Sequence, residues 1–73
     1  MKTIDKLEDI FTVSPGERVS YNGYTIQVTY YEVDGEIVDD LPGGWKVWED
    51  GELILATEDY NDLKLFFNEE TNN

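Results

Sequence analysis

Carboxylates are the side chains through which this chain could do chemistry. The sequence has 17 aspartate and glutamate residues against five lysine and arginine residues, which gives a formal net charge of −12. The acids are spread unevenly, and closely spaced carboxylates can attract a basic surface, hold a metal ion or pair as acid and base. The candidate contact residues form two groups: Glu32, Asp34, Glu36, Asp39 and Asp40, then Glu49, Asp50 and Glu52.

Electrostatic binding is the chemistry that this spacing favours. Carboxylates on alternate residues of a strand repeat about every 6.6 Å on one face, and each DNA strand carries a phosphate about every 3.4 Å. Such a row approximates a line of phosphates and can occupy a basic nucleic-acid channel of a partner protein. Trp48 and Tyr31 would be apolar anchors if they are exposed. The alternative is an ordinary solvated acidic face.

The spatial arrangement of the acids decides how large such a surface is. A third group, Glu58, Asp59 and Asp62, begins the last predicted helix. If the two hairpin tips and this helix start lie near one another, they form one extended acidic surface. The sequence leaves that convergence open.

Metal binding and catalysis find little support in the same residues. The acids around Asp34 and Asp50 lack the alternating spacing, central glycine and distant glutamate of a calcium-binding loop. The chain has no histidine and no cysteine, so Ser14 and Ser20 have no partner for a nucleophilic triad and thiolate metal sites are excluded. We expect no catalytic residue, no metal site, no cofactor and no enzymatic activity.

Composition predicts one small folded domain over residues 1–73. A hydrophobic content of 40% argues against disorder despite the charge. The negative charge disfavours direct binding to nucleic acid or to an anionic membrane. No apolar run reaches the roughly 20 residues of a membrane-spanning helix, and residues 1–5 lack the apolar core of a signal peptide. We therefore expect a cytoplasmic protein.

Antiparallel hairpins are predicted over residues 17–39. Asn22-Gly23 suits a type I′ turn, because both central residues of that turn need a positive φ, and it joins strands at residues 17–21 and 24–33. Counting from this turn pairs Tyr21 with Tyr24 and Val19 with Ile26 on one apolar face.

The Asp34-Gly35 turn gives an internal conflict. Counting places Ile37 opposite Glu32 and Asp39 opposite Tyr30, so the apolar residues no longer share one face. A β-bulge near residues 32–33 would resolve the conflict. Otherwise, an apolar patch forms on the outer face from Tyr31, Val33 and Val38.

A second hairpin is predicted over residues 45–56, after a mobile, glycine-rich loop at residues 40–44. Asp50-Gly51 closes this hairpin, and both of its faces are apolar. Counting from the turn gives five pairs: Glu49 with Glu52, Trp48 with Leu53, Val47 with Ile54, Lys46 with Leu55, and Trp45 with Ala56.

Helices are predicted at both ends of the chain. Residues 3–11 carry apolar side chains at helical spacing. Residues 58–68 do the same, with Thr57 as the N-cap, and residues 69–73 form a frayed tail. The fold class is therefore α+β, a small single domain with a short N-terminal helix, an antiparallel sheet of about five strands, and a C-terminal helix packed on that sheet.

In size and charge the chain resembles small acidic phage-encoded inhibitors, which include DNA-mimicking anti-CRISPR proteins, anti-restriction proteins and inhibitors of uracil-DNA glycosylase. The resemblance covers composition alone and carries over no site residue. It implies a non-enzymatic inhibitor that occludes a basic nucleic-acid-binding protein. The alternative is a structural or assembly module, such as a homodimer, that self-associates through an apolar sheet face or edge.

Overall fold

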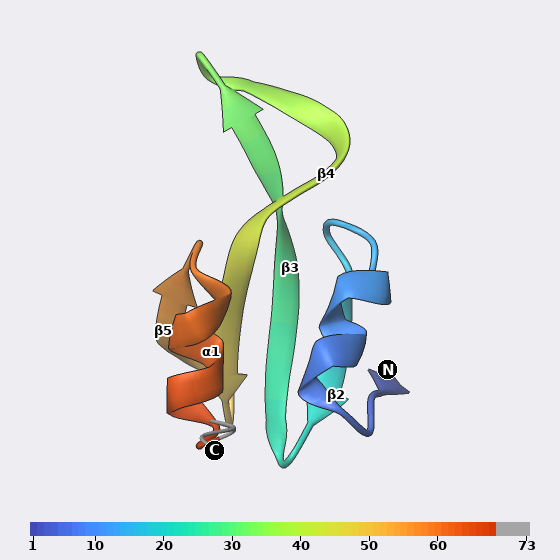
Figure 1. Cartoon of the computed structure of the whole chain (residues 1–73), viewed down its shortest axis with the longest axis vertical. Coiled ribbons are helices and arrows are strands. Elements are labelled where there is room, and N and C mark those ends of the chain that lie inside the picture. The colour runs from blue at the N-terminus through green and yellow to red at the C-terminus, as the bar shows by residue number, and fades with distance from the viewer. Residues whose placement is uncertain (69–73) are drawn as a thin grey trace.

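One mixed five-stranded sheet carries two helices on the same face (Figure 1). The computed structural model describes residues 1–68, without the side chains of Asp39 and Asp40. The strands follow one another across the sheet in chain order, β1-β2-β3-β4-β5. The elements are β1 (Lys2–Thr3), the 3-10 helix η1 (Leu7–Thr12), β2 (Arg18–Tyr21), β3 (Tyr24–Val33), β4 (Glu36–Glu49), β5 (Glu52–Thr57) and α1 (Tyr60–Phe66).

The α+β class is confirmed, and the first predicted hairpin has the predicted register. Tyr21 pairs with Tyr24 and Val19 pairs with Ile26. Asn22 and Gly23 both have positive φ values, 54° and 86°, as a type I′ turn requires. The apolar face predicted from this register is the face on which the core is built.

The core lies between that sheet face and the two helices. Burying one such aliphatic side chain contributes about 1.5–3 kcal/mol relative to exposing it. The buried apolar residues form a single cluster: Ile4, Leu7, Ile10, Val13, Val19, Tyr21, Ile26, Val28, Trp45, Val47, Leu63 and Phe67. Arg18, Gln27, Lys46 and Trp48 fall on the opposite face, because they alternate with these residues along their strands.

The N-terminal segment differs from the helix predicted at residues 3–11. Lys2 and Thr3 instead pair in parallel with β2, and the backbone N–H of Ile4 donates a hydrogen bond of 3.0 Å to the Ser20 carbonyl. This pairing takes the first residues into the sheet, so the helix starts only at Leu7, and its Lys6 N-cap makes no side-chain cap bond. The sheet is therefore mixed, where the sequence predicted a wholly antiparallel one.

The loop predicted at residues 40–44 is part of the 14-residue strand β4. Its pairing with β3 is irregular there: Tyr31 faces Val38, but Tyr30 faces Pro42 and Thr29 faces Gly44. Proline is tolerated in a strand at such a bulge.

Two glycines keep β4 close to its neighbours across this irregular stretch. A Cβ atom on Gly43 would meet the Tyr30 carbonyl, and one on Gly44 would meet the Thr57 carbonyl. The Gly43-Gly44 pair, predicted as part of a mobile loop, therefore makes a close backbone contact.

The predicted β4–β5 register holds only beside the turn. Glu49 faces Glu52 and Trp48 faces Leu53, as predicted, but a bulge at Ile54 shifts the rest by one residue. The predicted pairs Val47–Ile54, Lys46–Leu55 and Trp45–Ala56 are wrong. The observed pairs are Val47 with Leu55, Lys46 with Ala56 and Trp45 with Thr57.

The C-terminal helix is shorter than the range 58–68 predicted for it, and Asp59, not Thr57, is its N-cap. The Asp59 carboxylate accepts a hydrogen bond of 2.9 Å from the Asn61 backbone N–H. Thr57 Oγ1 accepts instead from the Asp59 backbone N–H and donates to the Asp62 carboxylate. The predicted tail at residues 69–73 lies outside the described residues. Within residues 1–68, no helix is both long and apolar enough to cross a membrane.

Candidate protein-binding site

An arm formed by the outer ends of β3 and β4 projects beyond the helices (Figure 1). We define the arm as residues 30–41. Its three described carboxylates, those of Glu32, Asp34 and Glu36, are all exposed. Large apolar side chains are exposed beside them: Tyr30 by 44%, Tyr31 by 46%, Val33 by 46%, Ile37 by 53% and Leu41 by 49%. The arm therefore combines negative charge with apolar surface.

The register of the arm decides between the two arrangements predicted for the Asp34-Gly35 hairpin. Ile37 faces Glu32, as predicted, whereas the predicted pair of Asp39 with Tyr30 is wrong. The irregular pairing lies within residues 39–43 of β4 and not near residues 32–33. The outer face therefore carries Tyr31, Val33 and Val38 together, the second of the two predicted arrangements.

Carboxylates lie on both faces of the arm and at its tip. Glu32 shares a face with Ile37, and Glu36 shares the opposite face with Val33, because residues paired across antiparallel strands point to the same side. Asp34 is in the turn, with a φ of 53°. The side chains of Asp39 and Asp40 lie outside the part of the chain that the structure describes.

The second acidic group lies at the opposite end of the molecule. Glu49, Asp50 and Glu52 are exposed around the β4–β5 turn, which is at the far end of β4 from the arm (Figure 1). Thr25 pairs near that turn and Val33 pairs near the arm tip, so the two turns are about 26 Å apart along β3. The two predicted groups do not converge on one surface.

The two predicted aromatic anchors differ in exposure. Tyr31 is open on the arm, as stated above. Trp48 is half-buried on the sheet face away from the helices, where the Arg18 guanidinium carbon lies 5.5 Å from the centre of its ring. The indole Nε1 atom of Trp48 is buried and has no hydrogen-bond partner among the described residues. Because an apolar anchor must be exposed, Tyr31 is a better candidate for this role than Trp48.

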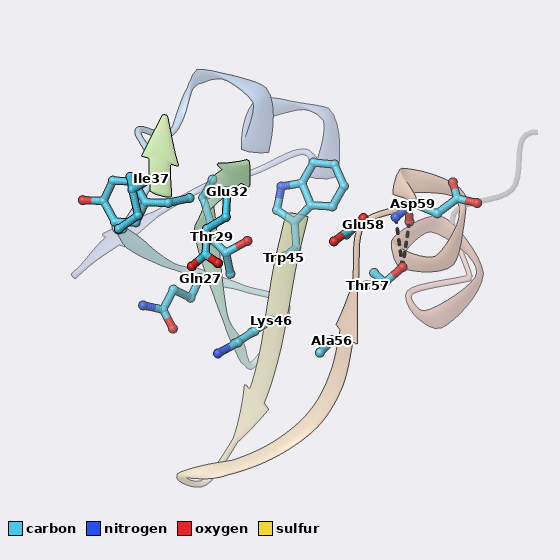
Figure 2. A pocket seen from close by; sticks show the side chains of 13 residues that line it. Gln27, Thr29, Glu32, Ile37, Trp45, Lys46, Ala56, Thr57, Glu58 and Asp59 are labelled. Carbon is cyan, nitrogen blue, oxygen red and sulfur yellow. Dashed lines mark hydrogen bonds between the residues drawn. The ribbon is translucent and has the colours of Figure 1, made fainter. Parts of the chain in front are cut away.

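A hollow of about 840 Å³ lies where the arm meets the body (Figure 2). The arm contributes Glu32 and Ile37, and the segment between β5 and α1 contributes Glu58 and Asp59. Lys46 adds a positive charge from β4. Glu58 and Asp59 of the third acidic group therefore line the same hollow as Glu32 of the first group.

Sequence reasoning did not find this hollow. Glu32 and Glu58 are far apart in the chain, and they line one hollow because β4 bends past β3 where Gly44 contacts the Thr57–Glu58 backbone. The Gly43-Gly44 pair was the available signal, because paired glycines in a strand mark a close backbone approach.

The chemistry that this arrangement supports is attraction of basic groups. Among the side chains that the structure describes, which leave out those of Asp39 and Asp40, no group of three or more acids is placed so that it could hold a metal ion. Comparisons of the chain with protein-family models, curated proteins and solved structures find no match. Any assignment of function therefore rests on the arm, the hollow and the charge.

Proposed function

We propose that this protein is a non-enzymatic acidic inhibitor that binds a partner protein and occludes its basic nucleic-acid-binding surface, in the manner of a DNA mimic. The arm is the principal contact. The observation that carries the proposal is the set of exposed carboxylates and exposed apolar side chains that the arm holds beyond the body.

The two kinds of side chain have different tasks in such a contact. Carboxylates such as Glu32 and Glu36 raise the rate of encounter with a basic surface and set the salt dependence of that rate. Tyr31 and Val33, which share one face of the arm, supply apolar area that is removed from water once the arm is seated. A monomer rarely keeps a contiguous apolar patch in water without a use for it.

Capture of the partner from a lysate of the source cells, at two salt concentrations and with duplex DNA as competitor, tests the proposal. We expect one basic nucleic-acid-binding protein to be retained at low salt, and to be released by added salt and by DNA. The triple variant E32K/D34K/E36K should abolish the capture.

A matched control separates a contact from total charge. The variant D5K/E8K/D9K makes the same change in net charge at three acids of the N-terminal segment, two of them exposed and Asp9 half-buried, and it should retain the partner. Equal capture by the two triple variants would contradict the role of the arm. Capture that ignores both salt and DNA would contradict the occlusion mechanism.

Self-association is a second candidate, and the open sheet face favours it. Trp48 is half-buried there, with its indole Nε1 lacking a partner, and Leu53 on the neighbouring strand is 44% exposed. A second copy seated on this face would cover both side chains. Sedimentation equilibrium at low micromolar concentration decides: a stable dimer that Trp48→Ala weakens favours assembly, and a monomer favours the inhibitor.

A further inference from the structure

The sheet ends in a long open edge at β5. The outer side of this strand pairs with no other strand among residues 1–68. An edge strand directs the backbone N–H and C=O groups of alternate residues away from the sheet, where they can pair with an added strand. At the opposite edge of the body, β1 has only two residues and is too short to receive a strand of ordinary length.

The composition of β5 leaves most of this edge unprotected, because Glu52 at its start is its only charged side chain. Leu53 is 44% and Ile54 38% exposed, and the strand contains no lysine, arginine or proline, which are the residues that commonly block edge pairing. The bulge at Ile54 is short, and β5 pairs regularly with β4 on either side of it. The edge therefore combines free backbone groups with apolar side chains.

Negative charge lies at both ends of this edge. Glu49, Asp50 and Glu52 surround its start, whereas Glu58, Asp59 and Asp62 follow its end. A second copy paired antiparallel would place the acids of each end against the acids of the other, and like charges across a strand pair are destabilising. A strand with basic residues at its two ends meets opposite charge at both.

We infer that the β5 edge receives an extended strand of the partner, apolar at its centre and carrying lysine or arginine at both ends. The inference rests on the proposed function and adds to it the conformation and charge pattern of the segment that is bound. It also gives Glu49, Asp50 and Glu52 a role separate from that of the arm. The added strand continues the sheet beyond β5.

A synthetic peptide tests the inference without the natural partner. The probe has alternating valine and threonine at its centre and two lysines at each end. It is titrated into the isotope-labelled full chain at low salt, and backbone amide signals and amide hydrogen exchange are recorded by NMR. We expect saturable binding, with the largest shifts and the largest gain in protection along β5 and no comparable change in the arm.

Edge variants make the test specific. Leu53→Lys adds a blocking charge to the edge and should weaken peptide binding by about tenfold or more. Leu53→Thr keeps a strand-forming residue without charge and should weaken it less, which separates blocking from misfolding. The control Leu65→Lys changes a side chain that is 59% exposed on α1 and should leave the affinity unchanged.

Each outcome supports or overturns the inference. Shifts confined to the arm, or equal affinity for the wild type and Leu53→Lys, would overturn it. A free chain that dimerises with a gain of amide protection along the outer side of β5 would show that a second copy fills the edge, which also overturns it. The arm variant E32K/D34K/E36K should bind the peptide normally, so failure of the arm proposal and failure of the edge are seen separately.

Discussion

The β2–β3 hairpin and the arm are made by the same kind of turn and end in opposite environments. Their turns begin with Asn22 and Asp34, whose φ values are 54° and 53°. Beside the first turn, Ile26 is completely buried, whereas beside the second, Tyr31 and Ile37 are 46% and 53% exposed. The turn sets which residues pair, but it does not decide which of them are covered.

Coverage comes from the two helices, and the arm extends past both. η1 and α1 lie over the lower part of the sheet (Figure 1), and their apolar side chains complete the single core cluster. The same alternation of apolar and polar residues therefore gives a core in the body and an open ribbon in the arm. Apolar residues that stabilise one region leave the other available for contact.

The two regions should differ most in how much free energy of unfolding is lost when a side chain is truncated. Ile26→Ala removes a fully buried side chain and should lower the free energy of unfolding by about 2–5 kcal/mol. Ile37→Ala makes the same change on the arm and should alter it by less than about 0.5 kcal/mol. Urea denaturation followed by tryptophan fluorescence measures both.

A milder substitution at the same position keeps the comparison measurable if Ile26→Ala unfolds this small domain completely. Ile26→Val should cost about 0.5–1.5 kcal/mol, within the range that denaturation can resolve. A cost for Ile37→Ala as large as that for Ile26→Ala would show that the arm is packed, and the contrast between the regions would fail.

The junction of arm and body should be sensitive to one added carbon. Gly44→Ala places a Cβ atom against the Thr57 carbonyl and Glu58, so we expect a loss of about 1–3 kcal/mol. Thr29→Ala, at the paired position on β3, is the control and should cost less. Denaturant midpoints compare the two; a neutral Gly44→Ala would mean that the strand shifts freely at the junction.

The helix that borders the hollow depends on its N-cap. Asp59→Ala removes the carboxylate that accepts from the Asn61 N–H and should cost about 1 kcal/mol. Glu58→Ala removes a neighbouring exposed acid that does not cap the helix, and it should be nearly neutral. Thermal unfolding monitored by circular dichroism distinguishes them, and equal melting temperatures would argue against the cap.

The smallest effect on stability should accompany a large effect on binding. Tyr31→Ala and Val33→Ala, made together in the arm, should change the free energy of unfolding by less than about 0.5 kcal/mol and yet greatly reduce partner capture. Leu65→Ala, at an exposed site on α1, is the matched control for both measurements. If the double variant still captures the partner, the charged side chains of the arm alone account for the contact.

Local signals in the sequence predicted the hairpins well. Each Xaa-Gly turn lies where it was expected, and the pairs next to each turn, such as Tyr21 with Tyr24 and Trp48 with Leu53, are correct. Two central residues with positive φ determine such a turn by themselves, so no distant part of the chain is needed to place it.

Distant contacts caused the errors. The path of β4 around Gly43 and Gly44 depends on backbone atoms of Tyr30 and of the segment after β5, and no local pattern contains that information. The N-terminal strand likewise depends on pairing with β2. Of the apolar stripe in residues 3–11, Ile4, Leu7 and Ile10 are buried but Phe11 is 59% exposed, and the periodicity did not predict the conformation that buries the first three.

The candidate site was predictable in composition and not in layout. The exposure of acids such as Glu32 and Glu49 follows from their chemistry. The separation of the two acidic groups follows from the continuity of β4, which was predicted as two segments joined by a loop. Because of that one error, neither the distance between the two acidic groups nor the hollow could be predicted.

The strands lie in the sheet in the same order as in the chain, and this order affects how the protein folds. Every strand pairs with the strand before it in the sequence, so the sheet can grow by one neighbour at a time and few contacts must wait for the closure of a long loop. Folding on the order of milliseconds is then expected for so short a mixed domain. On this order of events we expect α1 to dock last, bringing Leu63 and Phe67 into the core.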